Sequence, residues 1–319
     1  MKRQAQHGAA IVMAMLTVVL VATMASAALW QQWRAVEVET AERTRAQSTW
    51  VLIGALDWAR LILKEDARKG GADHLAEPWA LALEQARLST FLAADRSDTL
   101  AAQASQNAFL SGQMVDLQSR LNTTNLIQGG KVHGATLQMF VRLFDQLGLN
   151  PRLLETLVSQ LLLSAGDKPQ APLRPYDIDQ LAWLGVDADS IERLRPFVTI
   201  LPERTPVNLN TASPLVLVAC LGVDPAAAQQ LVQARSLNPW DSLEAVRAVA
   251  PSGLRSLDAQ AVSISSRFFE LRGTLQIDNH TVHEISMVQR DGLQIKTLWR
   301  KRTVGAAAGS PRPATYNDL

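Results

Sequence analysis

The sequence predicts an α+β fold with a long N-terminal helix, a large all-α region in the middle of the chain and antiparallel strands near the C-terminus. Three observations support this prediction. The run from Ala9 to Trp33 contains no charged side chain. A short motif of an apolar residue, glycine, an apolar residue and Asn or Asp recurs at intervals of 37 residues. Near the C-terminus, apolar and polar residues alternate, as expected of strands with one buried face.

The uncharged run is long enough to cross a membrane. As a helix, its 25 residues would extend roughly 37 Å, which exceeds a hydrocarbon core of about 30 Å. Lys2 and Arg3 precede the run, whereas Trp30 and Trp33 mark its far end, where aromatic rings favour the membrane interface. The positive-inside rule therefore places the N-terminus in the cytoplasm and the rest of the chain across the membrane.

A secretory signal is the alternative interpretation of the same segment. Ala25-Ser26-Ala27 would provide a small-x-small cleavage site and release a soluble protein that begins near Ala28. Two features oppose this interpretation. The apolar core is slightly long for a signal peptide, and no Pro or Gly interrupts the chain between Ala9 and Ile53. We therefore expect one continuous helix that is first apolar all round and then amphipathic.

The short basic leader that ends in Gly8, followed by an apolar segment from Ala9, resembles the precursors of type IV pilin-like proteins. This resemblance implies that a prepilin peptidase cleaves between Gly8 and Ala9 and leaves the anchor on the mature protein. Met13 stands where pilins of this class usually carry Glu, which would pair with the amine of a neighbouring subunit. A subunit with no neighbour ahead of it has no such need. The residues expected to pack against the filament and membrane are Val12, Met13, Leu16, Val19, Trp30 and Trp33.

Composition is consistent with a substantial folded part after the anchor. The chain has 319 residues, of which 47% are hydrophobic, and its net charge of +1 provides no basic field for nucleic acid. Its single cysteine, Cys220, excludes an internal disulfide. Because Cys220 lies within an apolar run, we interpret it as a small buried hydrophobe.

The middle of the chain contains the internal repeat. The motif recurs at Leu147-Gly148-Leu149-Asn150, Leu184-Gly185-Val186-Asp187 and Leu221-Gly222-Val223-Asp224, and each copy is followed by a leucine at the same offset. In each unit, the glycine would end one helix with a positive φ and the Asn or Asp would cap the next helix. Three helical hairpins therefore make up the predicted all-α region, unless such short motifs recur by chance.

The third unit resembles the helix-hairpin-helix domains that bind DNA phosphates, which suggests a different function. In such domains, backbone amides at the start of the second helix face a phosphate. Asp224 occupies that place here, and its carboxylate would repel the phosphate, while the nearby charges form no basic patch. A periplasmic DNA-binding protein of the competence type is therefore the alternative, and we expect no nucleic-acid binding.

Two further motifs, together with the leader, make the chain similar to minor pseudopilin K of the type II secretion system. The first motif matches at Asp116, Gln118, Arg120 and Asn122, although Ser119 and Leu121 replace the usual Gly and Phe. The second motif matches at Asn208, Asn210 and Thr211. The resemblance implies a bacterial inner-membrane protein with a periplasmic body that caps the pseudopilus tip. Its implied partners are the I, J and H types of minor pseudopilin, the prepilin peptidase, secreted substrates and the outer-membrane secretin.

Alternation predicts one strand over 115–122 and three C-terminal strands over 267–277, 281–290 and 293–300, with Leu293, Ile295 and Trp299 on one face. By resemblance, these strands form a pilin-like sheet that packs on the second half of the long helix, and the all-α region is an insertion in this pilin-like body. The predicted domains are a leader (1–8), a transmembrane segment (9–33), the first part of the body (34–127), the inserted helical domain (128–262), the C-terminal strands (263–303) and a disordered tail (304–319).

No catalytic motif is recognisable, so we expect a protein that is not an enzyme and needs no cofactor. Calcium enters only through the family resemblance, since relatives are reported to bind it with several oxygen ligands. Asp167, Asp177 and Asp179 lie near one another around a Pro-rich loop, but such groups are usually solvated. We therefore assign no metal ligands from the sequence.

Overall fold

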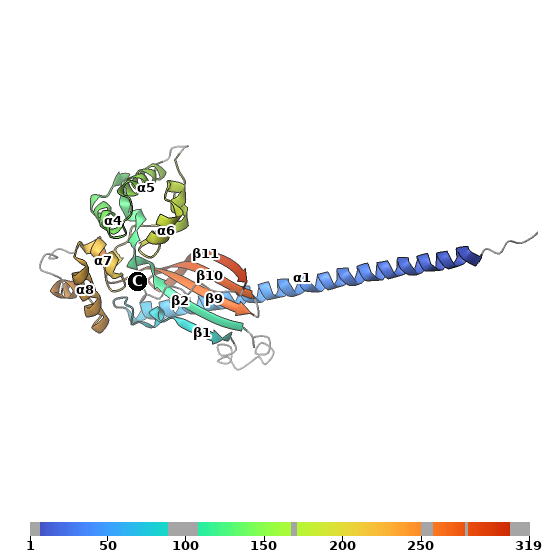
Figure 1. Ribbon diagram of the computed structural model, residues 1–319. Helices are drawn as coiled ribbons and strands as arrows, with labels where there is room; N and C mark the ends of the chain where they lie inside the picture. The colour runs from blue at the N-terminus through green and yellow to red at the C-terminus, as the bar shows by residue number, and fades with distance from the viewer. Residues whose placement is uncertain (1–6, 89–107, 167–170, 250–257, 278–279, 307–319) are drawn as a thin grey trace, which may run out of the picture. The chain divides into compact units, whose positions relative to one another are not determined.

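The computed structural model describes residues 7–88, 108–166, 171–249, 258–277 and 280–306 (Figure 1). The chain divides into two compact units, Met1–Gly54 and Ala55–Leu319, and each is described by itself. The predicted domain boundaries differ from this division and stay predictions. The predicted leader lies outside the described residues except for its last two positions, and residues 307–319 of the predicted tail also lie outside them.

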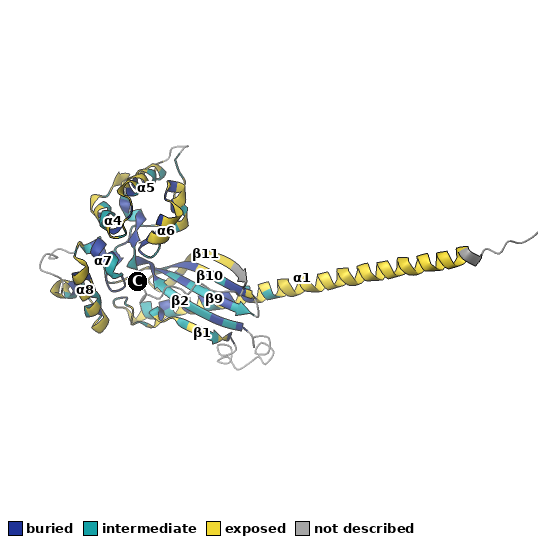
Figure 2. Ribbon diagram, viewed as in Figure 1, coloured by how far each residue is buried: buried dark blue, intermediate teal, exposed yellow. Residues whose placement is uncertain are grey.

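The first unit is helical. Helix α1 runs from His7 to Lys69, and its residues up to Gly54 form most of that unit. Its N-terminal part is long and apolar enough to cross a membrane. Figure 2 shows this part as exposed along its length. The continuous helix predicted through the Ala25-Ser26-Ala27 site is confirmed, and it ends at Gly70 and Gly71, which both have positive φ angles.

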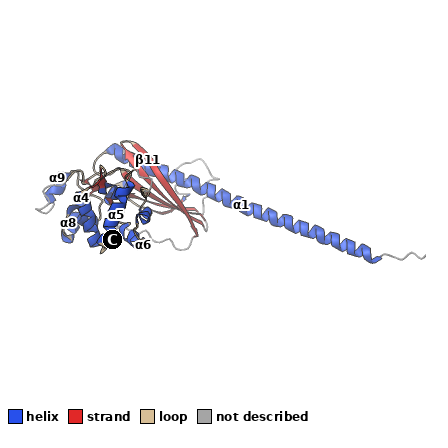
Figure 3. Cartoon of the chain, turned by 90° about the horizontal axis from the view of Figure 1, so that it is seen from above, coloured by secondary structure: helices blue, strands red, loops and turns tan. Residues whose placement is uncertain are grey.

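The second unit contains an antiparallel sheet of five strands in the order β1-β2-β9-β10-β11 (Figure 1). Figure 3 shows the strands of this sheet in red, seen from above. The strands are β1 (Leu83–Arg87), β2 (Ala108–Asp116), β9 (Phe268–Ile277), β10 (His280–Asp291) and β11 (Gln294–Ala306). The three predicted C-terminal strands are therefore confirmed. Strand β11 is longer than expected, because residues 304–306, predicted as tail, pair with β10 up to the partners His280 and Ala306.

One face of the sheet packs on the C-terminal end of α1, as predicted. Leu56, Ala59 and Leu63 of the helix share a buried cluster with Phe269 and Val288 of the sheet. Trp79, in the short 3-10 helix η1 (Pro78–Ala80), joins this cluster with its ring edge-on to Phe269, at 5.2 Å between ring centroids. Burial of these apolar side chains supplies the main stabilisation of this part.

The opposite face of the sheet has its own buried cluster, formed by Leu117, Leu201, Phe268 and Met287, with Trp299 against it. Ile295 belongs to the helix-facing cluster, so the prediction that Ile295 and Trp299 share a face is wrong. The reason is a β-bulge: Met287 pairs with Trp299 but Val288 pairs with Thr297. The extra residue on β11 reverses the alternation of side chains beyond it.

The prediction of one continuous strand over 115–122 is also wrong, although both ends of that range lie in strands. Strand β2 ends at Asp116, and the chain turns through the 3-10 helix η2 (Leu117–Ser119) into the two-residue strand β3 (Leu121–Asn122). The carboxylate of Asp116 accepts a hydrogen bond from the amide of Gln118, and the side chain of Asn122 does the same for Thr124. Such side-chain caps favour turns over a continued strand. Three polar members of the alternation, Asp116, Gln118 and Asn122, are buried rather than exposed.

The insertion is helical, as predicted, with a few two-residue strands between its helices. Its helices are α4 (Gly134–Gln146), α5 (Pro151–Ser164), η4 (Ile178–Leu184), α6 (Ala188–Leu194), α7 (Pro214–Leu221), α8 (Pro225–Leu237) and α9 (Leu243–Val249). The short strands include β4 (Ile127–Gln128) with β5 (Lys131–Val132), β6 (Val198–Thr199) beside β3, and β7 (Val207–Asn208) beside β8 (Val262–Ser263). The pairs β3–β6 and β7–β8 are parallel.

The three repeats form the predicted hairpins. Gly148, Gly185 and Gly222 have φ angles of 59°, 86° and 69°. The residues two positions later, Asn150, Asp187 and Asp224, each cap the following helix by accepting a backbone amide hydrogen bond. The leucines at the common offset, Leu157, Leu194 and Leu231, are each 1% exposed in one apolar core. The period of 37 residues therefore reflects three copies of one helical unit.

Side chains from different repeats brace these hairpins. The guanidinium of Arg193, in the second unit, donates to the carbonyl of Leu147 at the first hairpin. Arg142, in the first unit, donates to the carbonyl of Ala219 near the third hairpin, at 2.7 Å. Cys220 is buried nearby, and burial raises the pKa of its thiol to about 12. The interpretation of Cys220 as a buried hydrophobe rather than a reactive thiol is thus supported.

Candidate functional site

The residues of the two sequence motifs meet in a buried polar junction between the sheet and the third helical unit. Asp116, at the end of β2, accepts four hydrogen bonds there. Its Oδ1 accepts from the amide of Gln118, and its Oδ2 accepts from Thr211 Oγ1 at 2.5 Å, Ser266 Oγ at 2.6 Å and Asn208 Nδ2 at 3.1 Å. The junction therefore ties together three segments that are distant in the sequence.

Burial raises the pKa of Asp116 to about 6, although the hydrogen bonds from Ser266, Thr211 and the Gln118 amide oppose that shift. The carboxyl is consequently ionised at neutral pH. Hydrogen-bond donors rather than a salt bridge stabilise this buried charge. Removal of the carboxylate would take away an acceptor that these buried donors share.

The second motif holds the start of the third unit. Asn208 donates to Asp116, to Ser266 Oγ and to the carbonyl of Asp73, while its own Oδ1 accepts from the amide of Asn210. Asn210 forms two hydrogen bonds with the backbone of Trp240, at 2.8 and 3.0 Å. All three asparagine and threonine residues of this motif are at most 2% exposed. Their role in this structure is to join segments, and none faces an open cavity as a catalytic group would.

The rest of the first motif binds the chain that returns from the insertion. Gln118 donates to the carbonyl of Pro206 and accepts from the amide of Arg267. Asn122 donates to the carbonyl of Glu203 and accepts from the amide of Leu201. Arg120 is half-buried, and burial lowers the pKa of its guanidinium while the charge of Glu270 opposes the shift. The motif thus fixes both the exit into the insertion and the return from it.

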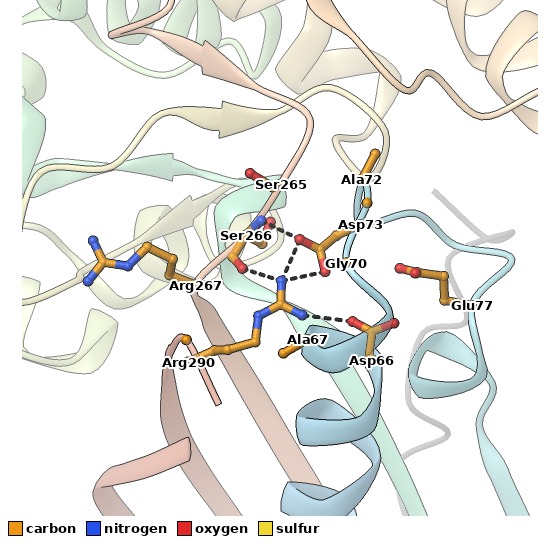
Figure 4. A pocket seen from close by; sticks show the side chains of 12 residues that line it. Asp66, Ala67, Gly70, Ala72, Asp73, Glu77, Ser265, Ser266, Arg267 and Arg290 are labelled. Atoms are coloured by element: carbon orange, nitrogen blue, oxygen red, sulfur yellow. Dashed lines mark hydrogen bonds and ion pairs between the residues drawn. The ribbon is translucent and has the colours of Figure 1, made fainter. Parts of the chain in front are cut away.

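A pocket of about 260 Å³ lies beside the junction, at the end of α1 (Figure 4). Arg290 of β10 reaches into it and forms ion pairs with Asp66 of α1, at 2.7 Å, and with Asp73, at 2.5 Å. Asp73 also accepts from the amide of Ser266, which connects the pocket to the junction. Burial raises the pKa of Asp73, against the opposing effect of Arg290. The guanidinium also lies over the ring of Phe269, at 5.0 Å from its centroid.

Glu77 completes the carboxyl groups of the pocket. The carboxyl oxygens of Asp66, Asp73 and Glu77 lie within 4.8 Å of one another. Glu77 Oε2 accepts from the indole Nε1 of Trp79 at 2.7 Å and from the amide of His74 at 2.9 Å. The pKa of Glu77 is raised to about 7, chiefly by burial. Asp66 adds to this shift as an acceptor for the protonated form and as a nearby negative charge, while the hydrogen bonds from His74 and Trp79 oppose it.

Neither the carboxyl cluster of the pocket nor the pair Asp177 and Asp179 fits calcium. In the pocket, the guanidinium of Arg290 already supplies the positive charge between Asp66 and Asp73. Asp177 pairs with Lys301, and Asp179 pairs with Arg195 at 2.6 Å. Asp167 lies outside the described residues. A calcium ion would have to displace these cations, whereas calcium sites use oxygen ligands only.

The other predicted functional residues lie on α1. Gly8 and Ala9 are within its first turns, so the proposed cleavage site is part of the described helix. The expected packing residues are exposed there, at 60–67% for Val12, Met13, Leu16, Val19, Trp30 and Trp33. Large apolar side chains exposed along a helix are typical of a surface that lipid or a partner covers. The roles assigned to these residues stay predictions.

Sequence reasoning missed the pocket and half of the junction. Asp66, Asp73, Glu77, Ser266 and Arg290 belong to no recognisable motif. Arg290 is 217 residues from Asp73 in the sequence, and no spacing rule relates them. The only available signal was the pair Gly70-Gly71, which marks a turn after the helix and therefore places Asp73 near its end.

Comparisons with known proteins agree with the sequence resemblance. The family model for "Type II secretion system (T2SS), protein K" matches residues 207–266. Type II secretion system protein K of Pseudomonas aeruginosa is 25% identical, and the match covers 99% of this chain and 98% of that protein. The protein of the same name from Klebsiella pneumoniae is also 25% identical, over 93% of this chain and 96% of that protein.

A solved structure supports the fold. The GspK–GspI–GspJ complex from the type 2 secretion system of enterotoxigenic Escherichia coli contains a chain that matches with a TM-score of 0.64 at 19% identity. The match covers 82% of this chain and 98% of that chain. The predicted α+β architecture with a helical insertion is therefore confirmed.

Proposed function

From the similarity of nearly the whole chain to type II secretion system protein K, we propose that this chain is the minor pseudopilin that caps the pseudopilus tip. In this role it initiates the pseudopilus and supports export of folded proteins across the outer membrane. The proposal makes it a structural subunit rather than an enzyme. The observation that carries the proposal is the full-length match, from the anchor to the C-terminal strands, to proteins of that name.

The proposed topology is a single pass through the bacterial inner membrane, with the N-terminus in the cytoplasm and the folded body in the periplasm. A prepilin peptidase would cleave between Gly8 and Ala9, and the new amine would be methylated. The apolar, exposed start of α1 supports such an anchor, and the continuation of the helix past Ala27 does not favour release by a signal peptidase.

The proposed partners are the I and J types of minor pseudopilin, which the structural neighbour contains, and the H type. Two features support a terminal position in the filament. Met13 replaces the acidic residue that would pair with a subunit ahead. The insertion, which extends over about 130 residues, would have a diameter on the order of 30 Å, too large to fit between closely stacked subunits.

DNA binding is a weaker candidate function, because backbone amides at the hairpins that would contact phosphates already donate hydrogen bonds to aspartate side chains. The carboxylate of Asp224 accepts from the amide of Ala227 at 2.9 Å, and Asp187 accepts from Ser190 in the same way. These amides are the groups that a DNA-binding hairpin would offer to phosphate. We therefore infer that the repeats serve protein architecture.

Coexpression with a prepilin peptidase and the I and J pseudopilins tests the proposal. We expect the intact mass to show loss of residues 1–8, and light scattering to show one copy of the chain in each complex. Gly8→Val should block processing, because the added bulk would not fit a site shaped for glycine. Gly54→Ala, which changes another glycine of the same helix with open space around it, should leave processing unchanged.

Three outcomes would contradict the proposal at different points. A mature N-terminus at Ala28 would show that the segment is a secretory signal. More than one copy per complex would exclude a tip subunit. Complete absence of the I and J subunits from the purified complex would remove the proposed partnership.

A further inference from the structure

The pocket at the end of α1 is lined by three carboxyl groups, those of Asp66, Asp73 and Glu77, and by two arginines, Arg267 and Arg290. Asp66 lies at the end of the helix, and Asp73 and Glu77 follow in the turn. Arg290 is the cation that bridges two of these groups, and with all three carboxyls ionised the cluster would carry a net charge of −2. A partly enclosed cluster of this kind is stabilised when one carboxyl retains a proton.

Glu77 is the member placed to hold that proton. Asp66 and Asp73 each form an ion pair with the guanidinium of Arg290, whereas Glu77 accepts hydrogen bonds from Trp79 Nε1 and from the amide of His74. One oxygen, Oε2, accepts both of these hydrogen bonds. Its other oxygen is therefore available for a proton shared with Asp66.

The contacts of Glu77 reach the core of the body. Trp79, which donates to Glu77, is 1% exposed and packs edge-on against Phe269 in the cluster beneath the sheet. Asp66 connects through Arg290 to β10, and Asp73 connects through Ser266 to Asp116. A change of charge at Glu77 would therefore act on the end of the helix, the sheet and the junction with the insertion.

We propose that Glu77 and Asp66 form a proton-dependent latch that holds the turn after α1 against the sheet at acidic pH and loosens as the pH rises through neutrality. In the closed state, protonated Glu77 donates to the Asp66 carboxylate. Loss of that proton removes this hydrogen bond and places three negative charges around Arg290, even though the Trp79 indole and the His74 amide bind the ionised carboxylate more strongly. The latch goes beyond the proposed tip function and does not depend on it.

The surroundings of Glu77 are consistent with this assignment. The charged and titratable groups that face it are Asp66 from α1, Asp73 and His74 from the turn, and Arg290 from β10. Arg267, at the start of β9 on the rim of the pocket, is engaged by Glu203 at 2.9 Å. Among these groups, Arg290 is the fixed positive charge within reach of the carboxyls, and it is already bound by two of them.

The sign of the effect follows from linkage. The pKa of Glu77 is raised from 4.5 in the unfolded chain to about 7 in the folded chain. The stabilisation of the folded state by the Glu77 proton is therefore complete below pH 4.5 and declines as the pH rises from there to about 7. One proton can change the unfolding equilibrium constant by up to about tenfold per pH unit, and by less where solvent screens a half-buried carboxyl.

The experiment uses the full chain in detergent micelles, labelled with ¹⁵N in tryptophan and ¹³C in the glutamate carboxyls, and titrated from pH 5 to 8.5. We expect the indole N–H resonance of Trp79 and the carboxyl resonance of Glu77 to titrate together with a midpoint near 7. Glu77→Gln should abolish both titrations. Glu155→Gln, at an exposed position on α5, is the matched control and should leave both in place.

Thermal unfolding of the same samples gives a second readout. The Tm of the wild type should fall from pH 5 to 8, and Glu77→Gln should flatten part of that fall and unfold at a higher temperature at pH 8. A carboxyl midpoint near 4.5 in the wild type would overturn the proposal, even if the variant fails to fold. Equal pH dependence of Tm in the wild type and a folded Glu77→Gln variant would overturn it as well.

Discussion

The polar junction and the helical hairpins both use aspartate side chains as hydrogen-bond acceptors, but the bonded residues are separated by very different lengths of sequence. At the junction, Asp116 binds side chains that lie 92, 95 and 150 residues away in the sequence. At the hairpins, Asp187 and Asp224 bind amides only three residues ahead. The junction carboxylate is 3% exposed, whereas Asp224 is exposed at the start of its helix.

This difference determines what each residue stabilises. A helix cap contributes to one helix and can be replaced in part by water. The buried carboxylate joins the end of β2, the third helical unit and the start of β9, and no water can replace it without opening the structure. Loss of the junction should therefore affect the whole second unit, and loss of a cap should affect one hairpin.

The largest expected effect comes from Asp116→Ala. The substitution removes the acceptor of four hydrogen bonds and leaves their donors buried. Since each buried unsatisfied group costs about 1–3 kcal/mol and the losses are not additive, we expect the free energy of unfolding to fall by about 3–5 kcal/mol. Denaturant unfolding of the full chain in micelles measures it.

Asp145→Ala, at an exposed position in α4, is the matched control and should change stability by less than about 0.5 kcal/mol. Limited proteolysis adds a spatial readout. Asp116→Ala should expose sites on both sides of the junction, in the sheet and in the third helical unit. A loss no larger than that of the control would show that the junction does not join these parts energetically.

The same contrast explains which features were predictable from the sequence. Gly222 and Asp224 specify a hairpin within three residues, so the repeat could be predicted in detail from local chemistry. Asp116 and Asn208 were recognised only as members of motifs. Their partners come from distant segments, and the alternation around Asp116 suggested a strand where the side-chain caps produce a turn.

Other errors also follow from features without a local signal. The bulge between the partners of Met287 and Val288 moved Trp299 to the opposite face of the sheet from Ile295, and nothing in the alternation of residues indicates it. The cluster around Arg290 forms because the end of α1 meets β10, where Arg290 lies 224 residues after Asp66 in the sequence. Such contacts are properties of the tertiary structure.

A middle-sized effect is expected at the hairpin glycines. Gly222 has a φ of 69°, a conformation that costs an L-residue about 1–2 kcal/mol. An added Cβ would lie 3.7 Å from Arg142 Cζ, an ordinary contact, so Gly222→Ala tests backbone strain rather than a clash. We expect unfolding of the full chain to be easier by about 1–2 kcal/mol.

Gly134→Ala is the control for that measurement, because Gly134 lies in α4 with ordinary φ and open space around it. It should leave the stability unchanged or raise it slightly, because alanine favours a helix over glycine. Equal destabilisation by both substitutions would show that the glycine conformation is not what the hairpin requires.

The smallest expected effect is that of Asp224→Ala, which sharpens the contrast with Asp116→Ala because the same side chain is removed. The variant loses the hydrogen bond from the Ala227 amide to Asp224, which is 2.9 Å long, and because Asp224 is exposed, water can enter where its carboxylate was. We expect a loss of about 1 kcal/mol in the free energy of unfolding. Hydrogen exchange should become faster in the first turn of α8 and remain unchanged at the junction.

Asp224→Asn should recover most of the loss, because asparagine caps a helix nearly as well. If Asp224→Ala destabilises the chain as much as Asp116→Ala, the division between local caps and a long-range junction is wrong.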